Sequence, residues 1–272
     1  HVVYVLYVSH VLYVLHVLPP VVEATRGGLL LLLLLLLLLL LLLLLALPVR
    51  VPLLREGGLE PLIIGAQGNH RFSCVDIQKE AAATLSNLAL DEKNRILIAK
   101  SGALPALVNL LRNPDSTCQV HAGEALANLA ESCAVHELLL TAQCLKPMCM
   151  LIQVTNSTRL DVKRAVSRCI SLLASNPETH THILQSTLIN SMKKLIADGD
   201  TRCQRWCTLT VANLALRKEN HRFLLENKSV ESLLLPLINS NDVETHRGVS
   251  FALHSFSRHE ENHSVLEDTL LR

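Results

Sequence analysis

The tripeptide Asn-Leu-Ala occurs three times in this sequence, at residues 87–89, 128–130 and 213–215. The first two copies begin 41 residues apart, and the second and third begin 85 residues apart, which is about two units of the same length. Self-similarity with a period of about 40 residues is typical of helical-repeat proteins, in which each repeat buries its apolar face against its neighbours. The spacing therefore predicts an all-α solenoid.

The register of the three asparagines continues into two more units, and we call the shared position the column. Its five members are Asn87, Asn128, Leu172, Asn213 and Ser255. Apolar or small residues recur six and two places before the column and one place after it in all five units, as Ala81, Leu85 and Leu88 do in the first. These offsets share one face of an α-helix, so we expect that face to be buried.

A shorter apolar stretch precedes each long helix from the second unit onward and predicts a second helix in each repeat. These stretches cover residues 104–111, 148–154, 189–197 and 230–238. Gly102, Pro105 and Pro114 mark the starts or stops of helices, because glycine and proline interrupt regular structure. After the column, charged residues at 91–95 and 217–222 open another helical stretch.

This pattern resembles the armadillo repeat family, and most of all its β-catenin-like and fungal vacuolar scaffold branch. The resemblance rests on residues 87–111 and 119–130, and it covers about residues 57–268. It implies a right-handed α-solenoid of about five repeats, with a concave groove lined by the third helix of each repeat. It also implies a non-catalytic scaffold that binds other proteins.

In that family the column asparagine faces the groove and can bond the backbone of an extended peptide. By resemblance, Asn87, Asn128 and Asn213 take this role. Leu172 and Ser255 depart from the pattern, so we expect an asparagine row that is broken in the middle and weakened at its end.

Positions four and eight before the column should share its face, because one and two helical turns are about 3.6 and 7.2 residues. The position eight places before the column is basic in four of the five units, as Lys79, Arg164, Arg205 and Arg247. The position four places before the column adds a cation, Arg168, in the third unit and an anion, Glu124, in the second. Residues 51–272 carry 23 basic and 23 acidic residues, so a basic stripe would favour an acidic protein or peptide partner. The alternative is that these are ordinary solvated helix positions.

Trp206 is the only tryptophan, and it lies seven places before Asn213. The importin-α branch of the family carries tryptophan four places before the asparagine, where it stacks on lysines of a basic signal. Ala83, Glu124 and Leu209 occupy that place beside the three asparagines here, so a nuclear-transport adaptor is the disfavoured alternative. Trp206 is either an exposed anchor for a partner or a core residue.

The first fifty residues differ from the rest in composition, and we assign 1–50 as a low-complexity segment and 51–272 as the armadillo domain. Seventeen leucines run from residue 29 to 45. Residues 29–47 are either a membrane anchor, since 19 residues span about 28 Å, or the translation of a simple repeat. An anchor with this distribution of basic residues would leave the repeats in the cytoplasm. Because no polar cap follows residues 264–271, we expect further repeats beyond residue 272.

The eight cysteines form no CxxC pair, and together with the thirteen histidines they are better explained as packed thiols and solvated residues than as metal ligands. We find no nucleophile elbow, phosphate loop or HExxH motif, so the sequence predicts neither an enzyme nor a cofactor. The neutral charge argues against nucleic-acid binding, and no small-molecule substrate is indicated. The predicted location is cytoplasmic.

Overall fold

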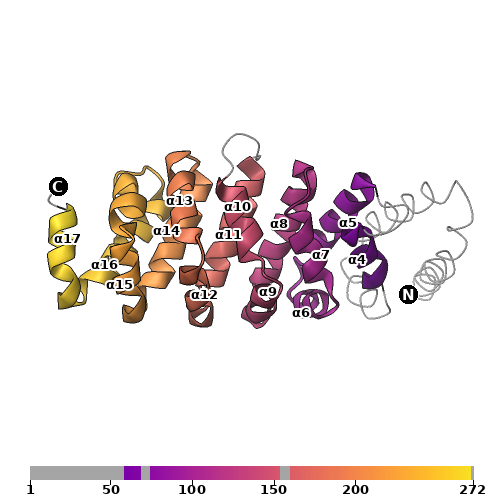
Figure 1. The fold of residues 1–272 in the computed structure, drawn as a ribbon, viewed down its shortest axis with the longest axis horizontal. Helices are drawn as coiled ribbons and strands as arrows, with labels where there is room; N and C mark the ends of the chain where they lie inside the picture. The colour runs from indigo at the N-terminus through magenta and orange to yellow at the C-terminus, as the bar shows by residue number, and fades with distance from the viewer. Residues whose placement is uncertain (1–57, 69–73, 154–159, 271–272) are drawn as a thin grey trace, which may run out of the picture. The chain divides into compact units, whose positions relative to one another are not determined.

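The computed structural model describes residues 58–68, 74–153 and 160–270, so the leucine run and the rest of residues 1–57 lie outside the described part. Each column residue lies near the end of a long helix, as the register predicts. These third helices of the repeats are α5 (Val75–Leu88), α8 (Ser116–Ala130), α11 (Leu160–Ala174), α14 (Thr201–Ala215) and α16 (Val243–Ser257). All secondary structure in the described ranges is helical, which confirms the all-α class (Figure 1).

Shorter helices precede the long ones, also as predicted. The second helices are α4 (Leu59–Gln67), α7 (Ala103–Leu110), α10 (Leu145–Gln153) and α13 (Leu188–Ala197). In the fifth repeat the second helix is a π-helical turn, η4 (Val230–Leu234), followed by a 3-10 turn, η5 (Leu235–Leu237). Pro236 lacks a backbone N–H donor, which explains why a regular α-helix does not continue there.

The first helices of the repeats are short and often begin with a 3-10 turn. They are α6 (Glu92–Lys100), η2 (Cys133–Val135) with α9 (His136–Thr141), η3 (Pro177–Thr179) with α12 (His180–Gln185), α15 (Lys218–Glu226), and η6 (Glu260–Asn262) with α17 (His263–Leu270). No single helix in the described ranges is long and apolar enough to cross a membrane, although one strongly bent pair of segments, Cys133–Thr141 with Leu145–Gln153, meets the criteria of length and composition.

The predicted core positions are buried. Side chains six and two places before the column and one place after it are less than a tenth exposed in every repeat, with Leu253 of α16 the half-buried exception. Most of these side chains are Leu, Ala or Val, so the helices pack closely and their burial supplies the main stabilising free energy.

Two compact units divide the chain, one ending at Val135 and the other beginning at His136. In the first unit, α5 packs against α4 and α8, and α7 packs against α8. The Asn113 amide of the turn before α8 donates to the Gln78 side chain of α5 (2.9 Å) and fixes that turn. Gly65 of α4 lies so close to α5 that a Cβ there would be 3.3 Å from Ala81 and Ile77.

In the second unit, α14 lies between α11 and α16 and packs against both, and α10 packs against α13. Lys163 of α11 is 5% exposed, and its ammonium lies 2.5 Å from the Asp198 carboxylate at the end of α13. Gly248 of α16 faces Thr208 of α14, and a Cβ at residue 248 would lie 2.9 Å from the Thr208 hydroxyl. Glycine thus permits the close approach of these two helices.

A repeated hydrogen-bond pattern joins four of the third helices, α5, α11, α14 and α16, to the first helix that follows each of them. Two consecutive side chains donate to carbonyls six residues earlier: Asn94 and Arg95, Thr179 and His180, Asn220 and His221, and Asn262 and His263. These bonds satisfy carbonyls that the end of a helix leaves without an intrahelical partner.

Candidate functional site

The column lies on the third helices, and its members differ in exposure. Asn87 and Asn213 are half-buried, whereas Asn128 is only 6% exposed. The Asn128 amide donates to the Ser86 carbonyl (3.0 Å) and to the Ser86 hydroxyl (3.3 Å), which joins α8 to α5. Ser255 is buried, and its hydroxyl donates to the Phe251 carbonyl within α16.

Three of the four basic residues eight places before the column pair with the aspartate that caps the next long helix of their own unit. The closest nitrogen–oxygen distances are 3.1, 2.7 and 2.5 Å in Lys79–Asp115, Arg164–Asp200 and Arg205–Asp242, which we call the ion-pair ladder. Each aspartate also accepts hydrogen bonds from backbone amides in the first turn of its helix. The ladder therefore ties neighbouring third helices together while it caps one of them.

The ladder stabilises the charged forms of its carboxylates. Burial alone would raise the pKa of Asp200, but hydrogen bonds from Arg164 and from Cys203 lower this pKa to about 2. The guanidinium of Arg205, together with Thr245, holds the pKa of Asp242 well below its usual range. Both carboxylates are consequently ionised at neutral pH, and they offset the charge of the basic stripe.

The remaining predicted residues on this face belong to α8, α11 and α16. Arg247 is exposed and lies 3.0 Å from Glu244 in the preceding turn of α16. Glu124 is exposed and lies 3.6 Å from His121. Arg168 of α11 is half-buried.

In the second unit, the corresponding face of the third helices also carries apolar side chains. Trp206 and Leu209 of α14 are half-buried, and Phe251 of α16 is 47% exposed. Leu209 and Phe251 both lie four places before the column, in line with Arg168. Large apolar and guanidinium groups together are typical of the side chains that dominate protein interfaces.

The aspartate partners of the ladder are absent from the residues predicted for the site. Their signal in the sequence is a short polar turn that ends in Asp immediately before the long helix: Asp115, Asp200 and Asp242. Helical periodicity relates residues of one helix, so it does not reveal that a basic residue of one repeat meets the capping residue of the next.

The cysteines behave as packed apolar groups. Six are buried, and burial raises the pKa of the Cys144 and Cys203 thiols to about 12. These thiols are protonated and unreactive at neutral pH. Within the described ranges, no three His, Cys, Asp or Glu side chains lie where they could hold a metal ion.

Residues 91–131 match the profile of the Armadillo/beta-catenin-like repeat, and they extend from the cap of α6 to the end of α8. Residues 91–131 therefore carry an armadillo repeat. A solved engineered protein aligns with 81% of this chain and 53% of its own, at 25% identity and a TM-score of 0.71. Computationally designed armadillo repeat proteins for modular peptide recognition align with 76% of this chain and 85% of their own, at 22% identity and a TM-score of 0.68. The armadillo solenoid predicted from the column is thus confirmed.

Two proteins similar to this chain are longer than it. Vacuolar protein 8 of Schizosaccharomyces pombe is 29% identical over 188 residues, which are 69% of this chain and 34% of that protein. Vacuolar protein 8 of Candida albicans is 28% identical over 168 residues, which are 62% of this chain and 28% of that protein. The chain therefore spans about a third of the length of these relatives.

Proposed function

We propose that this chain is a non-catalytic scaffold whose third helices bind an extended segment of a protein partner. The observation that carries the proposal is the half-exposed face of α11, α14 and α16, which offers an amide, guanidinium groups and apolar side chains in one register. One solved relative in fold is a designed armadillo repeat protein in complex with the peptide (KR)4, with a TM-score of 0.67 and 23% identity. A peptide laid along third helices is the binding mode that we assign here.

Within this face, Asn213 is the column asparagine best placed to bond a peptide backbone. It is half-buried, whereas the Asn128 amide already donates to Ser86. Leu209, Trp206 and Phe251 would contact apolar side chains of the partner. In the first unit, Asn87 would likewise bond a peptide backbone, about two helical turns after the ladder residue Lys79 on α5.

We assign an acidic character to the partner, with the exposed Arg247 as its main contact and Arg168 on the same face of α11 as a second cation. The ladder already neutralises Lys79, Arg164 and Arg205, so these three would add orientation more than net charge. Glu244 is half-buried beside the exposed Arg247 and can be displaced by a carboxylate of the partner, because an ion pair this open to solvent contributes little free energy. Acidic selectivity would therefore be moderate and sensitive to salt.

The test is binding of the full chain to matched acidic and basic peptide libraries at low and moderate salt. We expect preferential capture of acidic peptides, and the double substitution Arg168→Glu with Arg247→Glu should weaken that capture about tenfold. Arg222→Glu is the control, because Arg222 is exposed on α15 and pairs with Glu226 away from the third helices. Equal capture of both libraries, or equal loss in the control, would refute the assignment.

The names of two similar proteins support a proposal for the location of this scaffold in the cell. Vacuolar protein 8 carries the vacuole in its name, so we propose a cytoplasmic location with association to a vacuolar or similar membrane. Residues 29–47, the predicted anchor, lie outside the described residues, and tethering through them stays a prediction. Fractionation of cells that express the full chain or a chain without residues 29–47 tests it, since only an anchor would make membrane association depend on that segment.

A further inference from the structure

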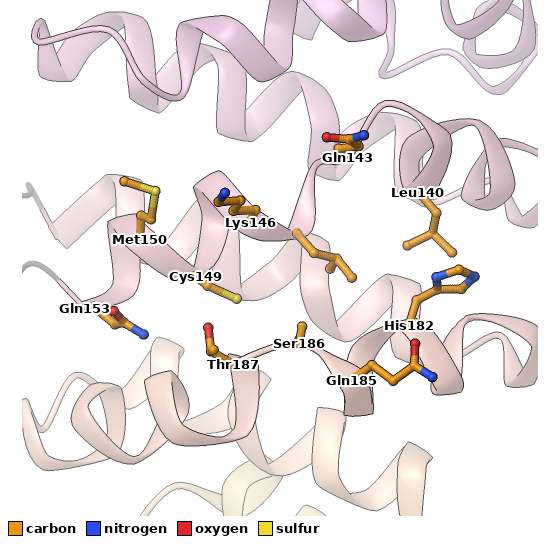
Figure 2. Close-up of a pocket in the computed structure, with 11 residues that line it drawn as sticks. Leu140, Gln143, Lys146, Cys149, Met150, Gln153, His182, Gln185, Ser186 and Thr187 are labelled. Atoms are coloured by element: carbon orange, nitrogen blue, oxygen red, sulfur yellow. The ribbon is translucent and has the colours of Figure 1, made fainter.

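A cleft of about 530 Å³ lies in the second unit, away from the third helices. It runs between α10 and the segment that joins α12 to α13 (Figure 2). In the figure Cys149 points toward Ser186 and Thr187 across the middle of the cleft, with Met150 and Gln153 toward one end and Leu140 and His182 toward the other. A volume of this size is within the range of binding pockets in proteins.

One wall of the cleft is the turn between α12 and α13, whose backbone differs from that of three other turns between a first and a second helix. In three repeats this turn contains a residue with positive φ: Gly102, Gln143 and Lys228. In the fourth repeat α12 ends instead at extended backbone, with Ser186 at φ −79° and ψ 167°. The Ser186 hydroxyl bonds the Ile183 carbonyl and accepts from the Leu188 amide, so the extended turn is held in place.

The floor of the cleft is apolar in character. Leu140 and Leu145 are half-buried and Cys149 is buried, whereas Met150 is 55% exposed at the edge. Burial raises the pKa of the Cys149 thiol, which is therefore protonated and acts as a small apolar group. The floor suits an apolar side chain, and it holds no ionised nucleophile at neutral pH.

The rim of the cleft is polar and carries one lysine. Lys146 and His182 line it together with three glutamines, and the eleven lining residues include no carboxylate. Seven of the eleven are exposed, so the cleft opens broadly to solvent as a surface for a chain segment does. The Gln153 amide already donates to the Ser191 hydroxyl (2.9 Å). Lys146 is the fixed positive charge of the lining, and it lies on α10 with Met150.

We propose that this cleft is a second docking site, which takes a peptide segment that carries an apolar anchor residue close to a carboxylate. The anchor would contact Met150, Leu145 and Leu140, and the carboxylate would pair with Lys146. The charge of the rim supports this occupant, because a basic segment would meet Lys146 and no carboxylate among the lining residues. The site is independent of the third helices, so a scaffold could hold two partner segments through different surfaces.

The chain contains three methionines, which makes a direct test possible. Met148 and Met192 are buried, and only Met150 borders the cleft. We would label the methionine methyl groups of the full chain with ¹³C and titrate a short probe peptide that alternates leucine with glutamate. The Met150 signal should shift, while Met148 and Met192 serve as internal controls.

Matched peptides and variants decide the outcome. Lysine in place of glutamate, or serine in place of leucine, should abolish the Met150 shift, and Lys146→Glu should weaken binding about tenfold. Lys194→Glu, at an exposed lysine of α13 outside the cleft, should leave binding of the probe peptide unchanged. Arg168→Glu should leave the Met150 response intact even if binding to the third helices is lost. An unchanged Met150 signal, a response to the lysine peptide, or a response insensitive to Lys146→Glu would overturn the proposal. A Met150 shift caused only by vesicles of phosphatidylserine and phosphatidylcholine would assign the surface to a membrane instead.

Discussion

At the scale of single residues, an aspartate of the ion-pair ladder has two functions. Asp200 accepts from the Cys203 amide at the start of α14 and pairs with Arg164 of α11. Asp91 caps α6 through the Lys93 amide (3.0 Å) and is not part of the ladder. The two positions therefore separate the effect of capping from the effect of joining two helices.

We predict that Asp200→Ala lowers the free energy of unfolding by about 2 kcal/mol and Asp91→Ala by about 1 kcal/mol, since loss of a cap alone costs about 1 kcal/mol. Urea denaturation of the full chain followed by circular dichroism measures both. Equal losses would mean that the ion pair contributes nothing beyond the cap.

A second residue-scale prediction concerns backbone conformation. Lys228 has φ 52°, in the left-handed region that costs a residue with a side chain about 1 kcal/mol. Lys228→Gly should remove that cost and raise the free energy of unfolding by about 0.5–1 kcal/mol. Lys194→Gly, within α13, should lower it by about 1 kcal/mol. Urea denaturation measures both changes. A Lys228→Gly protein with a lower free energy of unfolding than the parent would contradict this prediction.

At the scale of helices, the contact between α14 and α16 depends on Gly248. An alanine Cβ there would lie 2.9 Å from the Thr208 hydroxyl and 3.1 Å from its Cβ, so the helices must separate slightly. Gly248→Ala should cost about 1–3 kcal/mol, as overpacking usually does. Addition of Thr208→Ala should restore part of the loss, and thermal unfolding of the single and double variants tests whether the two changes are coupled.

The first helices are linked by buried histidines that must stay neutral. The Asn220 amide donates to Nδ1 of His180 (2.9 Å), whose Nε2 then donates to the Ala174 carbonyl, and Asn262 and His221 repeat the arrangement. Burial lowers the pKa of both histidines, and Arg217 near His180 acts in the same direction. His259 further lowers the pKa of His221, while Glu219 and Glu261 oppose it.

Because these pKa values are lower in the folded than in the unfolded chain, the unfolded state binds more protons below about pH 6.5. The stabilisation is complete above pH 6.5 and is lost as the pH falls toward the folded pKa values. We expect the urea midpoint to fall between pH 7.5 and 5.5, and His180→Gln with His221→Gln to flatten that fall. His246→Gln, at an exposed histidine of α16, is the control.

At the scale of the whole molecule, repeats make mainly local contacts, so stability varies along the chain. In the second unit α14 is packed on both sides by α11 and α16, whereas α17 contacts mainly the adjoining turn η6. We predict that amides of α14 exchange with deuterium at least about a hundredfold more slowly than those of α17. Exchange followed by mass spectrometry measures this, and similar rates would show that the unit opens only as a whole.

Much of this fold could be predicted from the sequence, because the column and its apolar offsets recur in five repeats. Leu85 and Leu88 are buried as the register requires, and α7 begins after Gly102 as expected. The pairing of Arg164 with Asp200 could not be predicted in this way, since it depends on how one repeat stacks on the next. The cleft beside Met150 also escaped prediction, because one of its walls is a single irregular turn of the backbone.

The ion-pair ladder has a consequence for how such a chain can change over generations. Each rung joins a cation of one repeat to the capping aspartate of the following repeat, so duplication or loss of one complete repeat can leave every rung closed. A change of a single cation, made to alter partner choice, instead leaves a carboxylate without its counter-charge. Duplication of whole repeats therefore costs this protein less stability than single substitutions in its binding surface, which require a second, compensating mutation.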